Sequence, residues 1–217
     1  MAEGKLLLVG GGGHCRSVLD CVLRSGVYEA VGIVERDGAP QAPVLGVPVV
    51  GYDADLPRLR SEGWQSAAVT LGSVGDPARR RALFKQLKAL GFALPVLADP
   101  SAVVSAHAEI AEGVFLGKRT VVNAGVKVGA CAIVNTGAVV EHDCRVGAFC
   151  HISPGAVLCG AVEVEENAHV GAGAVVIQGV RIGRGAIVGA GAVILHDVPA
   201  GCTVVGNPGR ILERERA

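Results

Sequence analysis

A six-residue repeat fills the second half of this chain and strongly limits how it can fold. Starting at Val104, an aliphatic residue recurs every six positions as far as Ile194, sixteen times without an insertion. Four residues after each of these stands Ala, Val, Thr or Cys, again sixteen times. Such a unit makes one flat side of a triangular prism, so three units close a coil and residues eighteen apart stack. The repeat predicts a parallel β-helix of about five coils.

The composition agrees with a thin, closely layered core. Half of the residues are apolar, yet aromatic residues make up only 3% and glycine occurs 32 times. A core without rings has to be built from Val, Ile, Leu and Ala, which suits stacked coils better than a bulky globule.

The residues before Pro100 lack the repeat and alternate between strand and helix patterns. Strands are expected over residues 5–9, 30–34, 67–71 and 92–97, and helices over residues 14–24 and 76–90. This order predicts a small parallel sheet with right-handed crossovers. We therefore predict a Rossmann-like domain over residues 1–100 and a β-helix domain over residues 101–217. The second domain is expected to end in a short capping segment over residues 210–217.

A run of four glycines, Gly10 to Gly13, lies between the first expected strand and helix. Glycines at this position let the backbone approach a phosphate, and the helix N-terminus favours its charge. A dinucleotide fingerprint would place its third glycine at Cys15, so we favour a nucleoside diphosphate over NAD. A carboxylate after the second strand is placed for a ribose hydroxyl. The candidate substrate-binding residues here are Gly11, Gly12, Gly13, His14, Glu35, Arg36 and Asp37.

Charge and cysteine usage exclude several classes of protein. The net charge is zero and no basic block occurs, which argues against nucleic acid or acidic membranes as partners. The apolar stretch at residues 5–9 is too short for a signal or a membrane span, so a cytoplasmic protein is expected. The seven cysteines include no C-x-x-C pair, and neither a disulfide framework nor a structural zinc is predicted.

The repeat resembles that of the left-handed β-helix acyltransferases, and further segments resemble one subfamily of them. This subfamily comprises N-acetyltransferases of nucleotide-linked 4-amino-4,6-dideoxy sugars, of the GDP-perosamine or UDP-bacillosamine-pathway type, and sialic acid O-acetyltransferases. The matching segments are Leu6–Val9 with the glycine run and His14, Asn135-Thr136-Gly137, Glu141-His142-Asp143, His151-Ile152-Ser153, Cys159-Gly160 and Gly206-Asn207-Pro208-Gly209. The resemblance implies that residues 1–100 are a nucleotide-sugar-binding domain and residues 101–217 an acetyltransferase domain. It also implies a homotrimer that binds acetyl-CoA in clefts between neighbouring prisms, without a metal.

His142 is the predicted general base. Acetyl transfer requires an acceptor amine that has lost a proton, and histidine accepts protons near neutral pH. Either Asp143 or Glu141 can orient the imidazole, and the resemblance favours Asp143. Gly160 lies eighteen residues after His142, one coil above it, where its N–H can stabilise the thioester oxyanion. We expect direct transfer, because Cys144 belongs to the inward small column and no nucleophile is suitably placed.

Other polar residues of the repeats receive weaker assignments. Asn135 is expected to contact the sugar, and Glu141 is a further substrate-binding candidate. His151 is expected to face a neighbouring chain's cleft and touch acetyl-CoA, and Arg181 to meet the CoA phosphates. Three histidines are interpreted as surface residues: His107, His169 and His196.

Three rival functions remain compatible with this architecture. The acceptor can instead be a hydroxyl of sialic acid or another sugar, since the same base serves both acceptors. A non-catalytic trimeric scaffold is a second rival, although His142 is present. A metal-binding β-helix of the carbonic anhydrase type needs three histidines that meet across an interface, and their spacing does not suggest one.

Overall fold

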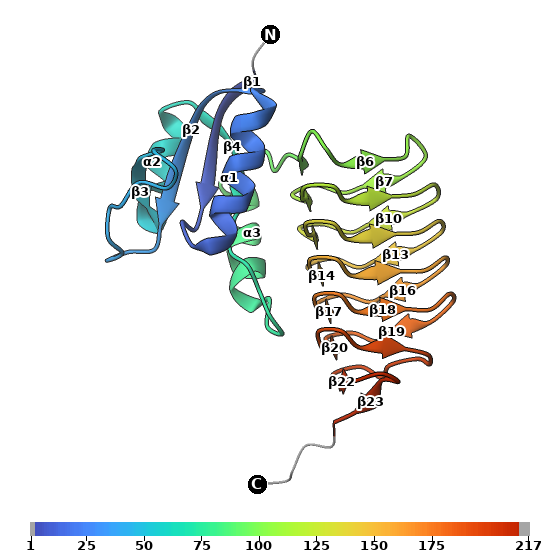
Figure 1. Ribbon diagram of the computed structural model, residues 1–217. Helices are drawn as coiled ribbons and strands as arrows, with labels where there is room; N and C mark the ends of the chain where they lie inside the picture. Colours follow the sequence, from blue (N-terminus) through green and yellow to red (C-terminus); the bar gives the residue numbers. More distant parts are fainter. Residues whose placement is uncertain (1–2, 213–217) are drawn as a thin grey trace, which may run out of the picture.

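The structure, a computed structural model, describes residues 3–212. An α/β domain lies beside a triangular prism of stacked coils, and one helix-bearing side of the domain faces the prism (Figure 1). The predicted fold class is confirmed: a Rossmann-like domain precedes a left-handed parallel β-helix.

The first domain is a four-stranded parallel sheet in the order β3-β2-β1-β4. Its elements are β1 (Glu3–Val9), α1 (Gly13–Ser25), β2 (Tyr28–Glu35), β3 (Val49–Tyr52), the 3-10 turn η1 (Asp53–Asp55), α2 (Leu56–Ser61), β4 (Trp64–Val69) and α3 (Ala78–Ala89). Side chains alternate across a strand, so Leu6 and Leu8 pack with α1 while Leu7 and Val9 pack with α2 and α3.

The expected last strand of this sheet, residues 92–97, does not form. Only Ala93 bridges to Ser66, and Leu97–Ala98 forms β5, which pairs with β8 on the prism. Pro95 lacks the N–H that a central strand would donate. The chain thus joins the prism at Leu97, four residues before the predicted start of the second domain. The sequence patterns also missed β3 and α2, which are short.

The prism consists of two-residue strands spaced six residues apart. They are β6 (Val103–Val104), β7 (Glu109–Ile110), β8 (Phe115–Leu116), β9 (Val121–Val122), β10 (Lys127–Val128), β11 (Ile133–Val134), β12 (Val139–Val140), β13 (Arg145–Val146), β14 (His151–Ile152), β15 (Val157–Leu158), β16 (Glu163–Val164), β17 (His169–Val170), β18 (Val175–Val176), β19 (Arg181–Ile182), β20 (Ile187–Val188) and β21 (Val193–Ile194). Each strand pairs in parallel with the one eighteen residues away, as Ile133 does with His151. The predicted stacking is confirmed.

The second residue of most of these strands points into the prism and is buried. Val140, Ile152 and Leu158 are fully buried, and so are Ala138 and Cys144 of the small column. Each coil therefore buries its aliphatic and small residues against the coils above and below it.

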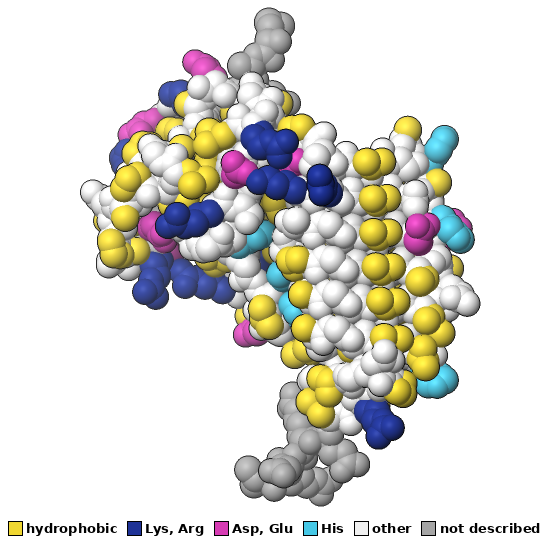
Figure 2. Space-filling model, in the orientation of Figure 1, with side chains coloured by type: hydrophobic (Ala, Val, Ile, Leu, Met, Phe, Trp, Pro, Cys, Tyr) yellow, Lys and Arg dark blue, Asp and Glu magenta, His cyan; other side chains and the backbone are white. Residues whose placement is uncertain are grey.

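The first residue of each strand points outward, so the eighteen-residue period gives each face of the prism its own chemistry. The face of β6, β9, β12, β15, β18 and β21 carries only valine; we call Val103, Val121, Val139, Val157, Val175 and Val193 the valine stripe. The face of β7, β10, β13, β16 and β19 carries only charged residues. A column of hydrophobic side chains runs along the open surface of the prism in Figure 2.

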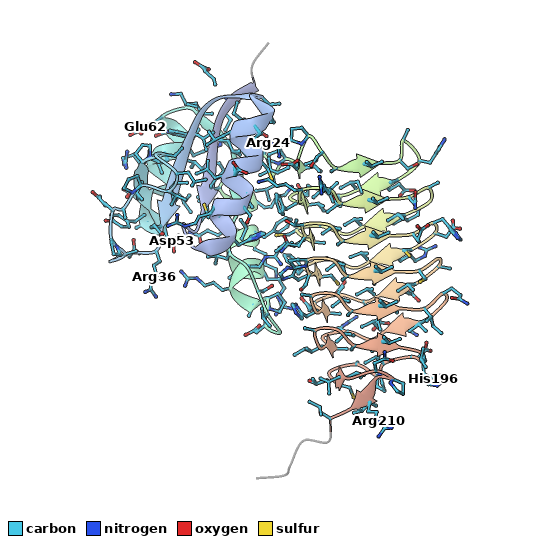
Figure 3. All side chains as sticks on the ribbon, in the orientation of Figure 1. Arg24, Arg36, Asp53, Glu62, His196 and Arg210 are labelled. Atoms are coloured by element: carbon cyan, nitrogen blue, oxygen red, sulfur yellow. The ribbon has the colours of Figure 1, made fainter. Side chains whose placement is uncertain are left out.

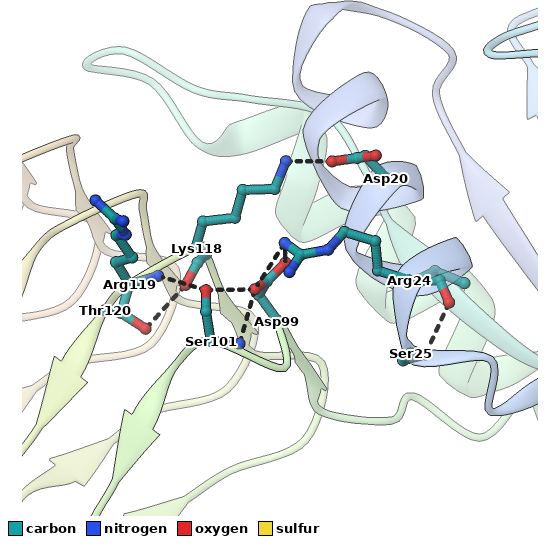
Figure 4. A network of polar contacts seen from close by, with 10 residues as sticks. Asp20, Arg24, Ser25, Asp99, Ser101, Lys118, Arg119 and Thr120 are labelled. Atoms are coloured by element: carbon teal, nitrogen blue, oxygen red, sulfur yellow. Dashed lines mark hydrogen bonds and ion pairs between the residues drawn. The ribbon is translucent and has the colours of Figure 1, made fainter.

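The third face is covered by the first domain. Phe115 and Ile133 of this prism face belong to the same apolar cluster as Leu6, Leu8 and Val18 of the first domain. Polar contacts surround this cluster (Figure 4): Lys118 pairs with Asp20, and the Arg24 guanidinium lies 3.2 Å from a carboxylate oxygen of Asp99.

The C-terminal end of the prism is closed by β22 (Thr203–Val205) and β23 (Arg210–Ile211), which pair antiparallel. Residues 213–217 of the predicted capping segment lie outside the described part of the chain. Within residues 3–212, no helix has the length and apolar character that a membrane span requires.

Candidate active site

His142 lies at the corner between the valine face and the charged face. The turn Glu141-His142-Asp143 connects β12 to β13. The His142 Nδ1 atom lies 2.9 Å from Asp143 Oδ2, and the His142 side chain is 64% exposed. Asp143 has φ of 61°, in the left-handed region that this turn position adopts whether it holds glycine, as at Gly155, or another residue, as at Phe149.

The neighbouring Glu141 turns away from the imidazole ring. Its Oε2 accepts a hydrogen bond of 2.8 Å from the Asn123 side-chain amide and a longer one, 3.4 Å, from the His142 backbone N–H. Asp143 is therefore the ring's partner, and Glu141 acts on the turn. The sequence analysis missed Asn123, although it lies eighteen residues before Glu141 and stacks directly beneath it.

Gly160 lies against the His142 ring, as the eighteen-residue stacking predicts. A Cβ atom on Gly160 would sit 2.6 Å from His142 Nε2 and Cε1. Ala161 N–H donates to the His142 carbonyl at 2.8 Å, which fixes the two turns relative to each other. The missing side chain of Gly160 therefore makes room for the imidazole.

This arrangement suits a histidine that accepts a proton. The Asp143 carboxylate can only accept a hydrogen bond from Nδ1, so the proton resides on Nδ1 and the lone pair on Nε2. The carboxylate also stabilises the imidazolium that forms after proton transfer. Because the ring is exposed, Nε2 can reach an acceptor that enters from outside the prism.

The glycine run opens onto a cavity at the carboxyl ends of β1 and β2. The cavity has a volume of about 320 Å³ and is lined by Gly10, Gly11, Gly12, Glu35 and Arg36, together with residues of other segments. Gly11 N–H donates to Glu35 Oε1 at 3.1 Å. The Asp37 side chain is exposed and does not line the cavity.

The sequence analysis also missed two residues that line this cavity, Asp53 and Arg79. Asp53 follows the unpredicted strand β3, and Arg79 lies in the first turn of α3. A carboxylate directly after a parallel strand is a signal that could have indicated Asp53, had β3 been recognised.

His14 lies between the two domains and faces the prism. Its ring packs edge-on against Phe115, with centroids 5.3 Å apart, and its Nε2 is buried without a hydrogen-bond partner among residues 3–212. Burial, together with the nearby His151 and Arg80, lowers the pKa of His14 to about 3. His14 is therefore neutral at physiological pH.

The structure places His151 differently from its expected position in a neighbour's cleft. The residue is 8% exposed and lies beneath its own chain's first domain. Its Nδ1 lies 2.7 Å from the Ser73 carbonyl, and its Nε2 lies 3.2 Å from the Asn135 amide nitrogen. Since the carbonyl can only accept, the proton is on Nδ1 and Nε2 accepts from Asn135. Asn135 thus links this buried histidine to the turn between β11 and β12.

The interpretation of His169 as a surface residue was wrong. It is 7% exposed and packs edge-on against His151, with centroids 5.2 Å apart. Burial lowers the pKa of His169 to about 4. An outward position on a β-helix is buried wherever another domain covers that face. His107 and His196 are exposed, as predicted.

Arg181 lies on the charged face, where it pairs with Glu165 and lies 4.0 Å from Glu163. The Cys144 side chain is fully buried in the prism. Residues 3–212 contain no cluster of three His, Cys, Asp or Glu side chains that could hold a metal ion.

The two candidate regions lie on different sides of the prism within one chain. The first domain with its glycine-run cavity covers one face, and His142 lies at the corner between the other two faces. Figure 2 shows histidine and acidic side chains along the prism edge that points away from the first domain.

Comparisons with known proteins match both halves of the chain. Residues 5–87 match the PglD N-terminal domain, and residues 108–142 and 161–196 match hexapeptide repeats of transferases. No curated protein sequence matches the chain.

Two groups of solved structures are similar over nearly the whole length. GDP-perosamine N-acetyltransferase from Caulobacter crescentus, solved with CoA and GDP-perosamine, is 42% identical, with 98% of this chain and 99% of that chain covered and a TM-score of 0.92. The acetyltransferase domain of PglB from Neisseria gonorrhoeae, in complex with acetyl coenzyme A, is 41% identical, with 96% and 98% covered and a TM-score of 0.89. WeeI from Acinetobacter baumannii shares the fold at 22% identity.

Proposed function

The chain belongs to the left-handed β-helix family of acetyl-CoA-dependent N-acetyltransferases that act on nucleotide-linked amino sugars, and we propose that it acetylates the 4-amino group of a GDP- or UDP-linked 4-amino-4,6-dideoxy sugar with His142 as general base. The observation that carries this assignment is the Asp143–His142–Gly160 arrangement at an exposed corner of the prism. A glycine-run cavity for the nucleotide diphosphate supports it.

In the proposed mechanism, His142 Nε2 takes a proton from the sugar's ammonium group, and the free amine attacks the acetyl thioester carbon. The negative charge on the thioester oxygen is stabilised by a backbone donor. The Gly160 N–H is free for this role, since it makes no hydrogen bond within residues 3–212. The C–S bond then breaks and the departing thiolate takes the extra proton from the attacking nitrogen, so that CoA leaves as the thiol and the amide is neutral. Asp143 stabilises the imidazolium until it gives its proton to water.

We infer that the working enzyme is a homotrimer. The valine stripe is an apolar sheet face that the chain's own first domain leaves uncovered, with Val103 64% exposed and the other five valines half-buried. Contiguous exposed apolar surface of this kind marks interaction sites. If a second copy packs along the stripe, the His142 corner of one copy lies closer to the first domain of the other copy. Within a single chain, the His142 corner and the first domain are far apart.

We place the protein in the cytoplasm. All seven cysteines are unpaired, and five of them are buried. Free buried thiols are typical of a reducing compartment.

The test is acetyl-CoA turnover, followed as thiol release, against GDP- and UDP-linked 4-amino sugars and free sialic acid, with His142→Ala as the variant. We expect turnover on an amino sugar and a fall of about 10²- to 10⁴-fold in the variant, the usual contribution of a general base. Turnover on sialic acid alone would show an O-acetyltransferase instead. Full activity in the variant would refute the assignment of the base.

A further inference from the structure

The glycine-run cavity contains an acid–base pair that the diphosphate and the ribose do not require. Asp53 lies directly after β3, and Arg79 lies in the first turn of α3, so both reach the carboxyl edge of the sheet. Figure 3 shows Asp53 and Arg36 at this edge of the first domain. The carboxylate and guanidinium of the pair are 3.9 Å apart, a separation at the outer limit of an ion pair.

Asp53 is an acceptor with unused capacity. Its side chain is 26% exposed, and within residues 3–212 no group donates a hydrogen bond to its carboxylate. Glu35, by contrast, is already held by the Gly11 N–H at the glycine run. Burial, with help from Asp37 and Glu35, raises the pKa of Asp53 against the opposing effect of Arg79. The carboxylate would therefore gain from a ligand that donates hydrogen bonds.

The rest of the cavity offers apolar walls for a flat ring. Leu71, Leu83 and Pro40 line it beside the pair. The glycine run, where α1 begins, binds the diphosphate in the proposed function, so the Asp53–Arg79 end is left for the base.

We propose that Asp53 and Arg79 select guanine over uracil, so that the acceptor of this enzyme is a GDP-linked amino sugar; this rests on the proposed function. Guanine presents one acceptor, O6, beside two donors, N1–H and the N2 amino group. Arg79 can donate to O6 while the two oxygens of Asp53 accept from N1 and N2. Uracil has one donor, N3–H, flanked by two carbonyl oxygens, so one carboxylate oxygen would face O2. A polar group left unpaired in this way lowers affinity.

The experiment measures binding of GDP, UDP and xanthosine diphosphate to the full chain by calorimetry. In xanthine a carbonyl replaces the N2 amino group. The intact protein is expected to bind GDP at least about tenfold tighter than UDP or xanthosine diphosphate, the scale of one good bidentate contact. In Asp53→Asn, the amide can accept from N1–H and donate to the new carbonyl. The variant should lose GDP affinity by about 10- to 100-fold and gain affinity for xanthosine diphosphate.

A matched control is Asp76→Asn, which removes the same charge outside the cavity. Asp76 accepts a hydrogen bond from Ala78 N–H at 2.8 Å, and asparagine can keep that contact. This variant should bind all three nucleotides as the intact protein does.

The outcomes separate the base assignment from the proposed function. Equal binding of GDP and UDP by the intact protein, or equal losses for all three nucleotides in Asp53→Asn, would overturn the base assignment alone. A gain of xanthosine diphosphate binding supports it and cannot come from a misfolded variant. Binding of none of the nucleotides would refute the nucleotide site itself, and the base assignment with it.

Discussion

The close approach of Gly160 to His142 makes Gly160→Ala a sharp test of the proposed role of His142. The new methyl carbon would lie 2.6 Å from the imidazole, whereas ordinary contacts begin near 3.4 Å. The ring must therefore retreat by about 0.8 Å or more, which displaces Nε2 from its position in the structure. A misplacement of about 1 Å at a reacting group costs on the order of 100-fold in rate, or about 2.7 kcal/mol of transition-state stabilisation.

The same substitution should leave the stability nearly unchanged. Gly160 does not have a positive φ, and the stacked positions eighteen residues before and after it hold His142 and Gln178, so the turn accepts a Cβ. The His142 side chain is exposed and can rotate into solvent. We expect the melting temperature to shift little while kcat/KM for acetyl transfer falls about 100-fold.

A double-mutant cycle shows whether the glycine acts through the histidine. If it does, Gly160→Ala should cost almost nothing further in a His142→Ala background, because the displaced ring is already absent. An undiminished 100-fold loss in that background would show that Gly160 acts independently of the ring, for example on the oxyanion. Full activity of the single variant would refute the geometric argument altogether.

Two further predictions concern the covered face and the uncovered face of the prism. Burial lowers the pKa of His14 to about 3 and of His169 to about 4, so below pH about 6.5 the unfolded chain binds protons that the folded chain does not. The free energy of unfolding should therefore decrease as the pH is lowered, by about 2 kcal/mol per histidine at pH 5. Between pH 7 and pH 5, the melting temperature of His169→Gln should fall less steeply than that of the intact protein, and parallel curves would contradict this. On the valine stripe, Val157→Lys should dissociate the trimer, as measured by analytical ultracentrifugation, and reduce turnover. The control Val27→Lys replaces an exposed valine in the first domain and should do neither. If Val157→Lys remains trimeric, the stripe is not the interface.

The sequence alone determined the prism and the position of the corner that carries His142. Strand spacing and coil closure are local consequences of a six-residue period, so the aliphatic column, the eighteen-residue stacking and the pairing of His142 with Gly160 could all be counted along the chain. The position of Asn123 beneath Glu141 follows from the same count, because the two residues are eighteen apart.

Only the tertiary structure decided the contacts that depend on backbone direction or on domain docking. The left-handed conformation of Asp143 turns its carboxylate to the imidazole, a choice that side-chain chemistry left open between Asp143 and Glu141. His151 and His169 occupy outward positions of the repeat, and they are buried because the first domain covers that one face. Asp53 and Arg79 meet because the connections that follow β3 and β4 both start at the carboxyl edge of the sheet, and no local pattern records such a meeting.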